Sequence, residues 1–265
     1  MRLLLAAVLV LPLPQAQAQS KAEFRPKFQK FDRVAVACKV QTEVTSSNGR
    51  NSKYDLELEL SAEVEKAEGE TAEFDCGVSV LRIKGTLDGK PVDYEWRKGG
   101  AEKGAKVASI QKGLEKGWKV VLGKKGIAVN DAANEFCDAL PLFNPGIFLG
   151  FSVPPPFEAV AVGKGWDLKN QSCPFFNGFS LRHVAELDLV KGDTAKVSAQ
   201  LSYTKAESEV PIEGVVNVKG EGHASMEYDL KAGRPVKGAT SLKLSATMGG
   251  LKRDVTQVIE FEVRR

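Results

Sequence analysis

Apolar and polar residues alternate along most of the chain. Between Tyr54 and Glu65 every second residue is apolar or aromatic, and the residues between them are mostly acidic. This period of two is typical of a β-strand with one face on a core and the other in water. The same alternation returns in further stretches, at 34–40, 74–80, 181–189, 195–203, 216–228, 242–248 and 259–263.

Short turn signals separate these stretches. Asn48-Gly49, Asp88-Gly89, Gly192-Asp193 and Gly233-Arg234-Pro235 all favour tight turns. Short connections join antiparallel neighbours. We therefore predict a mainly β protein, with about a dozen antiparallel strands, many of them longer than usual. Such strands would form a long curved sheet: a half-barrel, a barrel or two packed sheets.

The middle of the chain breaks the alternation. Residues 130–140 predict one short central helix, which Asn130 or Asp131 can cap and a proline ends. A Pro/Phe-rich connector follows at 141–157, and eight of the thirteen phenylalanines lie within 136–179. We expect the connector to pack across the sheet or to close one mouth of it.

The first eighteen residues have a composition of their own. Arg2 precedes the apolar run Leu3–Leu13, which at about 11 residues is too short to span a bilayer. Ala16-Gln17-Ala18 is a small-residue cleavage site. These features are typical of a secretory signal peptide cut after Ala18, so we expect a periplasmic or secreted protein. Because no cysteine stands directly after the cleavage site, and the first one is Cys38, lipid anchoring is not expected.

These divisions predict one continuous folded domain behind the signal peptide. Removing 18 of the 265 residues leaves 247, enough to bury a sizeable core. No later stretch approaches the roughly 18 apolar residues of a transmembrane helix. The predicted parts are the signal peptide 1–18, a flexible segment 19–29, an N-terminal β half 30–129, the helix and connector 130–158, and a C-terminal β half 159–265.

Four cysteines remain in the predicted mature chain, namely Cys38, Cys76, Cys137 and Cys173. An even number in an exported protein favours disulfides, and four cysteines allow three pairings. We favour Cys38–Cys76 and Cys137–Cys173, because the first two lie on apolar strand faces and the others flank the irregular middle. Metal binding is the competing interpretation. With two histidines and no C-x-x-C motif, we predict no metal site and no cofactor.

No motif for nucleophilic catalysis or phosphate binding is present. Ser152 lies in Leu-Gly-Phe-Ser-Val and not in the G-x-S-x-G motif of a nucleophile elbow. Glycines at 99–104 lack the strand-to-helix context of a phosphate-binding loop. We predict no catalytic residue. A hydrolase that uses two scattered acidic residues stays a third function class.

Several residues are candidates for ligand binding. His183 shares the parity of the apolar residues in its strand and should point inward, as a core histidine or as a ligand contact. His223 has the opposite parity and should face solvent. The connector aromatics could plug the core or form a binding patch. The candidate ligand-binding residues are Phe148, Phe151, Phe157, Trp166 and His183.

Charge is unevenly distributed along the chain. The stretch 55–75 has nine acidic residues and one lysine, whereas 97–125 has nine basic residues and two glutamates. These stretches are either the wet faces of different hairpins or the two poles of a molecule that docks on a charged partner. The formal net charge of +3 is too weak to indicate a nucleic-acid partner.

Three short motifs in the second half resemble a known family. They are the helix end Phe136-Cys-Asp-Ala-Leu-Pro141, the step Val162-Gly-Lys-Gly-Trp166, and the G-x-G strand with its glycine turn at 220–236. Through these motifs the chain resembles, over about 130–263, the exported bacterial domain-of-unknown-function family 6263. The resemblance implies a β-rich envelope protein and transfers no catalytic residue. The strand plan also resembles periplasmic half-barrel lipoprotein carriers, which cover a hydrophobic pocket with helices.

Two main function classes follow from these patterns. The first is a non-enzymatic exported protein that binds an apolar small molecule or lipid beneath the sheet, or an envelope protein. The second is a structural or assembly protein that acts through charged surfaces or sheet edges.

Overall fold

The computed structural model describes residues 21–100, 102–104, 110, 114, 117–123, 126–129, 145–172, 179–205, 215–248 and 250–264. The predicted signal peptide, the predicted helix at 130–140, Cys137 and Cys173 lie outside these residues. Among the described residues, no helix is long and apolar enough to cross a membrane.

The described chain consists almost entirely of strands. The elements of the first half are β1 (Lys21–Glu23), β2 (Arg33–Ser46), β3 (Ser52–Glu68), β4 (Thr71–Leu87), β5 (Lys90–Arg97), β6 (Lys103–Gly104), β7 (Trp118–Gly123) and β8 (Gly126–Val129). Those of the second half are the 3-10 helix η1 (Pro145–Leu149), β9 (Ala159–Ala161), β10 (Gly165–Ser172), β11 (Phe179–Lys191), β12 (Thr194–Lys205), β13 (Val215–Asp229), β14 (Arg234–Met248) and β15 (Leu251–Arg264).

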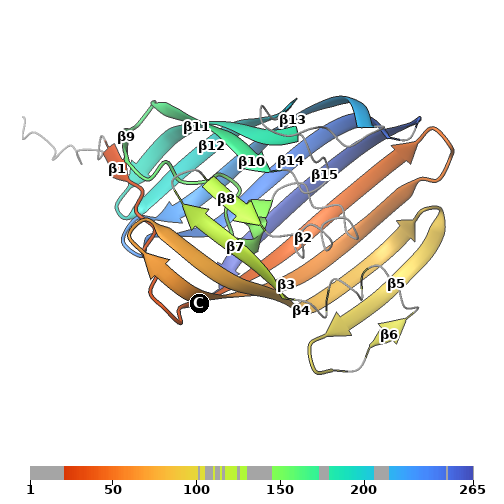
Figure 1. The fold of residues 1–265 in the computed structure, drawn as a ribbon, viewed down its shortest axis with the longest axis horizontal. Coiled ribbons are helices and arrows are strands. Elements are labelled where there is room, and N and C mark those ends of the chain that lie inside the picture. Colours follow the sequence, from red (N-terminus) through yellow and green to blue (C-terminus); the bar gives the residue numbers. More distant parts are fainter. Residues whose placement is uncertain are drawn as a thin grey trace, which may run out of the picture.

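Thirteen of these strands form one antiparallel sheet. Its order is β10-β11-β12-β13-β14-β15-β2-β3-β4-β5-β6, while β7 pairs with β4 and β8 pairs with β7. Figure 1 shows the long strands side by side in a curved sheet, with β7 and β8 in front of it. The predicted curved antiparallel sheet is therefore confirmed. It is open, with β10 and β6 at its ends, so the barrel alternative is wrong.

The alternation of the sequence becomes an inner and an outer face. On β3, Tyr54, Leu56 and Leu58 are at most 3% exposed, whereas Asp55 and Glu57 face solvent. Inward residues oppose inward residues across each pair of strands, because a register is stable only when it keeps the apolar set on one side. The inner face of the sheet is therefore the core.

One strand departs from the predicted alternation. The sequence places Leu189 on the inner face of β11 together with Leu187, but Leu189 is 42% exposed. The pairing with β12 shifts by one residue between Leu187 and Leu189, and Val190 is buried in place of Leu189. A β-bulge adds one residue to a strand and so reverses the parity beyond it.

The predicted Cys38–Cys76 disulfide is wrong, since both residues are buried free thiols. Cys38 lies on β2 and Cys76 on β4, with β3 between them, so two strand spacings of about 5 Å separate them. Cys76 is opposite Ala62, which is itself opposite Val34, four residues along β2 from Cys38. A disulfide needs Cα atoms within about 7 Å, and this separation exceeds that distance.

The connector packs across the inner face of the sheet, as expected. Residues 146–155 are all buried, and η1 lies against β2, β3 and β8. The Phe148 ring packs at a tilt against that of Trp118, with the centroids 4.9 Å apart, and Ser152 Oγ donates a hydrogen bond to the Ser225 carbonyl at 2.6 Å. The connector therefore fills this part of the space beneath the sheet with side chains.

A second segment, Phe24–Asp32, crosses the strand ends, and we call it the strap. Three backbone hydrogen bonds tie the strap to separate parts of the chain. They join Phe24 N to Glu158 O at 3.4 Å, Lys27 N to Gly233 O at 3.2 Å, and Phe31 N to Val64 O at 2.8 Å. Phe24 is fully buried, with its ring 5.3 Å from that of Tyr228. Phe28 packs edge-on against Phe74 at 4.9 Å. The strap therefore seals one end of the core.

Candidate functional site

The outer face of the sheet contains a trough with a volume of about 910 Å³. It runs across eight neighbouring strands, from β11 to β4, and is therefore about 34 Å long at the usual strand spacing. Its lining carboxylates are Glu57, Glu59, Asp188, Glu227, Glu260 and Glu262. Its lining cations are Lys39, Arg82, Lys196, Lys237 and Arg264.

Small side chains make the trough hollow. Ala37, Ala239 and Ser225 point outward from β2, β14 and β13 into its lining, between neighbours with long charged side chains. The floor is therefore short side chains and backbone, and the walls are charged groups.

The sign of the charge in the trough alternates from strand to strand. The series from β11 to β4 is Asp188, Lys196, Glu227, Lys237, Glu260, Lys39, Glu57 and Arg82. Opposite charges on directly facing positions stabilise a strand pair and disfavour slipped registers. Lys39, for example, has Glu260 opposite it on one side and Glu57 on the other.

Ion pairs form along most of the trough, and one of them joins β15 to β3 across β2. They are Arg82–Glu57 at 3.1 Å, Arg264–Glu59 at 3.1 Å, Lys196–Glu227 at 3.3 Å and Lys237–Glu227 at 3.5 Å. Hydrogen bonds to Glu57 and then to Glu95 raise the pKa of the Arg82 guanidinium. These charges are thus already compensated within the protein.

Three neighbouring charges at the centre of the trough differ from these paired groups. Lys39, Glu260 and Glu262 are exposed, and none of them takes part in an ion pair with another described residue. They surround the short side chains of Ala37 and Ala239. The centre of the trough therefore offers one cation and two carboxylates to a binding partner.

The residues predicted to bind a ligand lie elsewhere, in the core around the connector. Phe148, Phe151 and His183 are at most 1% exposed, and Phe157 is 8% exposed. Trp166 is half-buried, and its indole Nε1 donates to the Pro154 carbonyl at 3.2 Å. Their ring contacts are with other residues, Phe148 with Trp118, Phe151 with Tyr228 and Trp166 with Phe24. Ligand binding by these residues stays a prediction.

His183 points inward from β11, as its parity predicts, and lies opposite Leu201 and Leu168. Burial lowers the pKa of His183 to about 4, although interactions with the backbone of Ser152 and Leu181 oppose this shift. The imidazole is therefore neutral at neutral pH. Neither of its ring nitrogens has a hydrogen-bond partner in the described part of the chain, so both interpretations of this residue, core histidine and ligand contact, stay predictions.

The sequence pattern did not single out the trough residues. It identified them as charged residues on the solvent-facing side of their strands. Only the strand order brings positions as distant as 39, 57 and 260 together. A signal was present in the alternating sign of charge at matching positions of successive strands. Reading it requires the register. Among the described residues, no three His, Cys, Asp or Glu side chains are placed to hold a metal ion.

Comparison with known proteins adds little to this description. No known family matches the chain, and no curated protein does. DynF from the dynemicin biosynthesis pathway of Micromonospora chersina is 7% identical, with a TM-score of 0.20 over 98% of this chain and 91% of DynF. Pseudomonas aeruginosa OccK8 (OprE) is 11% identical, with a TM-score of 0.17 over 87% of this chain and 69% of its own. The resemblance to family 6263 stays a prediction.

Proposed function

We propose that the protein is an exported, non-enzymatic binding protein that holds an extended polypeptide of mixed charge in the trough. The observation that carries this proposal is the centre of the trough, where Lys39, Glu260 and Glu262 are exposed and have no ion-pair partner among the described residues. A partner with both amines and carboxylates can pair with all three.

The balance of charge supports a partner of both signs. The trough has six carboxylates and five cations, so neither a polyanion nor a polycation meets a uniform surface. Its length of about 34 Å matches about ten residues of extended chain. A groove this shallow and polar supports a peptide better than a compact apolar molecule.

Solvent-exposed ion pairs contribute little each, roughly 0.2–1 kcal/mol, and salt screens them. The interaction should therefore be weak and should depend strongly on ionic strength. A labelled peptide of alternating lysine and glutamate, measured by fluorescence anisotropy, should bind and should lose affinity between about 50 mM and about 300 mM salt.

Charge reversal at the centre provides the sharper test. Lys39→Glu would place three carboxylates together, and the peptide affinity should fall by about fivefold or more. Lys243→Glu is the matched control, because Lys243 is exposed on the outer face of β14 but lies outside the trough. Equal loss in both variants, or tighter binding of polyglutamate or polylysine, would contradict the proposal.

A second candidate is binding of an amphiphile beneath the sheet. On the inner face, Gln257 Nε2 donates to Thr42 Oγ1 at 3.1 Å, and Tyr54 faces Thr42 from the next strand. This polar strip lies among apolar residues such as Leu56 and Val255. It supports a ligand with one polar group and an apolar chain. Delipidated protein should then bind a fluorescent fatty acid saturably, and its failure to do so would exclude this candidate.

A further inference from the structure

The charges that line the trough are sorted by strand. The acidic residues lie on β11, β13, β15 and β3, and the basic residues lie on the strands between and beside them, β12, β14, β2 and β4. Among the lining charges, only Arg264 on β15 departs from this order, and its guanidinium is paired with Glu59 at 3.1 Å. Acidic and basic strands therefore alternate across the whole trough.

Two ladders of directly facing residues produce this alternation, and they meet on β15. The first ladder, from β12 to β15, is Lys196, Glu227, Lys237 and Glu262. The second ladder, from β15 to β4, is Glu260, Lys39, Glu57 and Arg82. Because Glu260 and Glu262 are two residues apart, the line of charges shifts by only about 7 Å as it crosses about 29 Å of sheet. A partner can follow this nearly straight line.

The distance between the strands restricts which partner stays in phase with the charges. Neighbouring strands lie about 4.8 Å apart, so the same sign returns at every second strand, after about 9.6 Å. The side chains on one face of a bound β-strand repeat at about 6.8 Å, which matches neither distance. The turns of an α-helix repeat at about 5.4 Å, and over the trough they drift by about 4 Å, nearly one strand spacing.

A polyproline II helix has a repeat that does match. It has three residues per turn and rises about 3.1 Å per residue, so each of its faces repeats at about 9.3 Å. Over the length of the trough, the difference from the 9.6 Å spacing adds up to only about 1 Å. Two of its three faces can point toward the floor of the trough while the third points to solvent.

The floor of the trough also favours this conformation. The backbones of β14, β15 and β2 are already paired with their neighbours along the sheet, so a bound chain cannot join them as an extra strand. The partner must bind through its side chains. A polyproline II helix has no internal hydrogen bonds and keeps its backbone solvated, so binding in this way leaves its backbone groups in contact with water.

We infer that the trough selects a polypeptide in the polyproline II conformation that has one basic and one acidic residue in every three. This inference rests on the proposed function and names the class of polypeptide. The basic face of the helix lies along the acidic strands, for example beside Glu260 and Glu262 on β15. The acidic face lies along the basic strands, for example beside Lys39 on β2. The third residue faces solvent, where proline favours the conformation.

Two labelled peptides of equal composition test this selection. The first repeats Pro-Lys-Glu four times, so each face has one sign, and in the polyproline II conformation its length of about 37 Å spans the trough. The second repeats Pro-Lys-Lys-Pro-Glu-Glu twice, which keeps the prolines, the length and the net charge but reverses the sign on each charged face at every turn. In fluorescence anisotropy at about 50 mM salt, the first should bind about fivefold more tightly.

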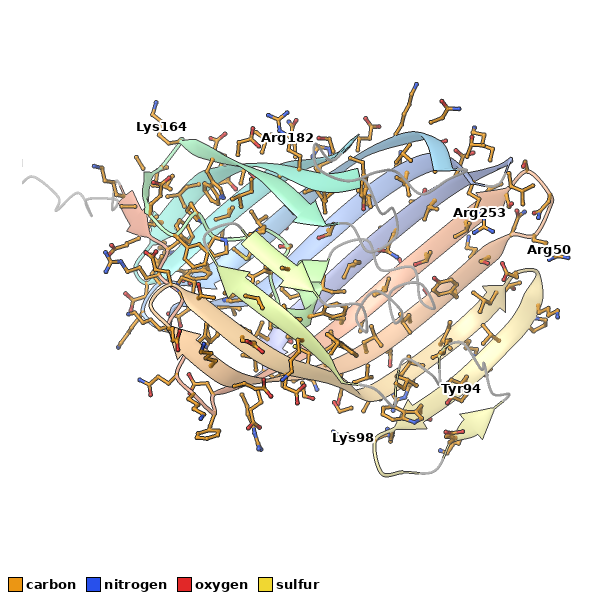
Figure 2. All side chains as sticks on the ribbon, viewed as in Figure 1. Arg50, Tyr94, Lys98, Lys164, Arg182 and Arg253 are labelled. Atoms are coloured by element: carbon orange, nitrogen blue, oxygen red, sulfur yellow. The ribbon has the colours of Figure 1, made fainter. Side chains whose placement is uncertain are left out.

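A pair of charge reversals shows whether the alternating strands cause the preference. Lys39→Glu places an acidic residue on a basic strand of the trough and should abolish the preference for the first peptide. Arg50→Glu is the matched control, because it makes the same change of charge outside the trough, in the turn after β2. Arg50 lies at the end of the molecule opposite Lys164 (Figure 2), and its variant should keep the fivefold preference.

The outcomes separate this inference from the proposed function. Equal binding of the two peptides by the wild type, or an unchanged preference in Lys39→Glu, would overturn the inference and leave peptide binding in place. Binding of neither peptide would overturn both. Sedimentation velocity of the full chain completes the test, since a dimer that excludes both peptides would place a second copy in the trough and would also overturn both.

Discussion

Burial decides the chemistry of the residues that the sequence marks as reactive. Desolvation raises the pKa of the Cys38 thiol to about 12 and also raises that of Cys76, so both thiols stay protonated. Shielded, protonated thiols react slowly and behave as small apolar residues. Cys38 and Cys76 are therefore packing residues, although the predicted export favours disulfides.

His183 makes stability depend on pH. Its folded pKa of about 4 lies below the ordinary 6.5, so between these values the unfolded chain binds a proton that the folded chain does not. The free energy of unfolding should therefore be fully retained above about pH 6.5 and fall by up to about 3 kcal/mol toward pH 4.

Urea unfolding at several pH values measures this contribution. The variant His183→Leu should lose this part of the pH dependence, whereas His223→Gln should keep it, because His223 is exposed. The same acid destabilisation in the His183 variant and in the wild type would show that the carboxylates alone are responsible.

At the scale of the elements, the connector depends on close approach to the sheet. A Cβ built on Gly238 in β14 would lie 2.6 Å from both Phe261 Cζ and Ser152 Oγ, and 2.7 Å from the Ser225 carbonyl. That carbonyl also accepts the hydrogen bond of Ser152. The glycine thus gives the connector room to lie directly on the strands.

Two strand glycines give a matched pair of variants. Gly238→Ala should lower the free energy of unfolding by about 1–3 kcal/mol through overpacking. Gly77→Ala in β4 has no atom within 4 Å of its new Cβ and should leave stability unchanged or raise it by up to about 1 kcal/mol. Denaturant titration measures both, and equal effects would mean that the connector does not pack here as described.

At the scale of the whole molecule, the last strand joins the two halves of the chain. β15 pairs with β2 along a continuous register from Arg253–Ser46 to Arg264–Ala35. The inner faces of both halves contribute to one core cluster. Neither half can unfold without breaking the ladder between β15 and β2, so the two halves should unfold together.

Single-tryptophan variants test this cooperativity. Of the three tryptophans, Trp118 lies in the first half and Trp166 in the second. In each protein that retains only one of them, the fluorescence midpoint in urea should match the midpoint measured by circular dichroism. Two separated midpoints would show that the halves are independent units.

The amino-acid sequence by itself determined the strands and their faces, because a period of two is a local property of the chain. It also predicted the inward His183 and the packing of the connector. The sequence did not reveal the Leu189 bulge, since a bulge depends on the partner strand. It misplaced the Cys38–Cys76 pair, because the distance between two cysteines depends on the strand order.

Only the tertiary structure decided where the candidate sites lie. The trough exists because β15 pairs with β2, which places Glu260 beside Lys39 despite their separation in the chain. Sequence periodicity assigns a residue to a face of its own strand, but neighbours across the sheet result from long-range pairing.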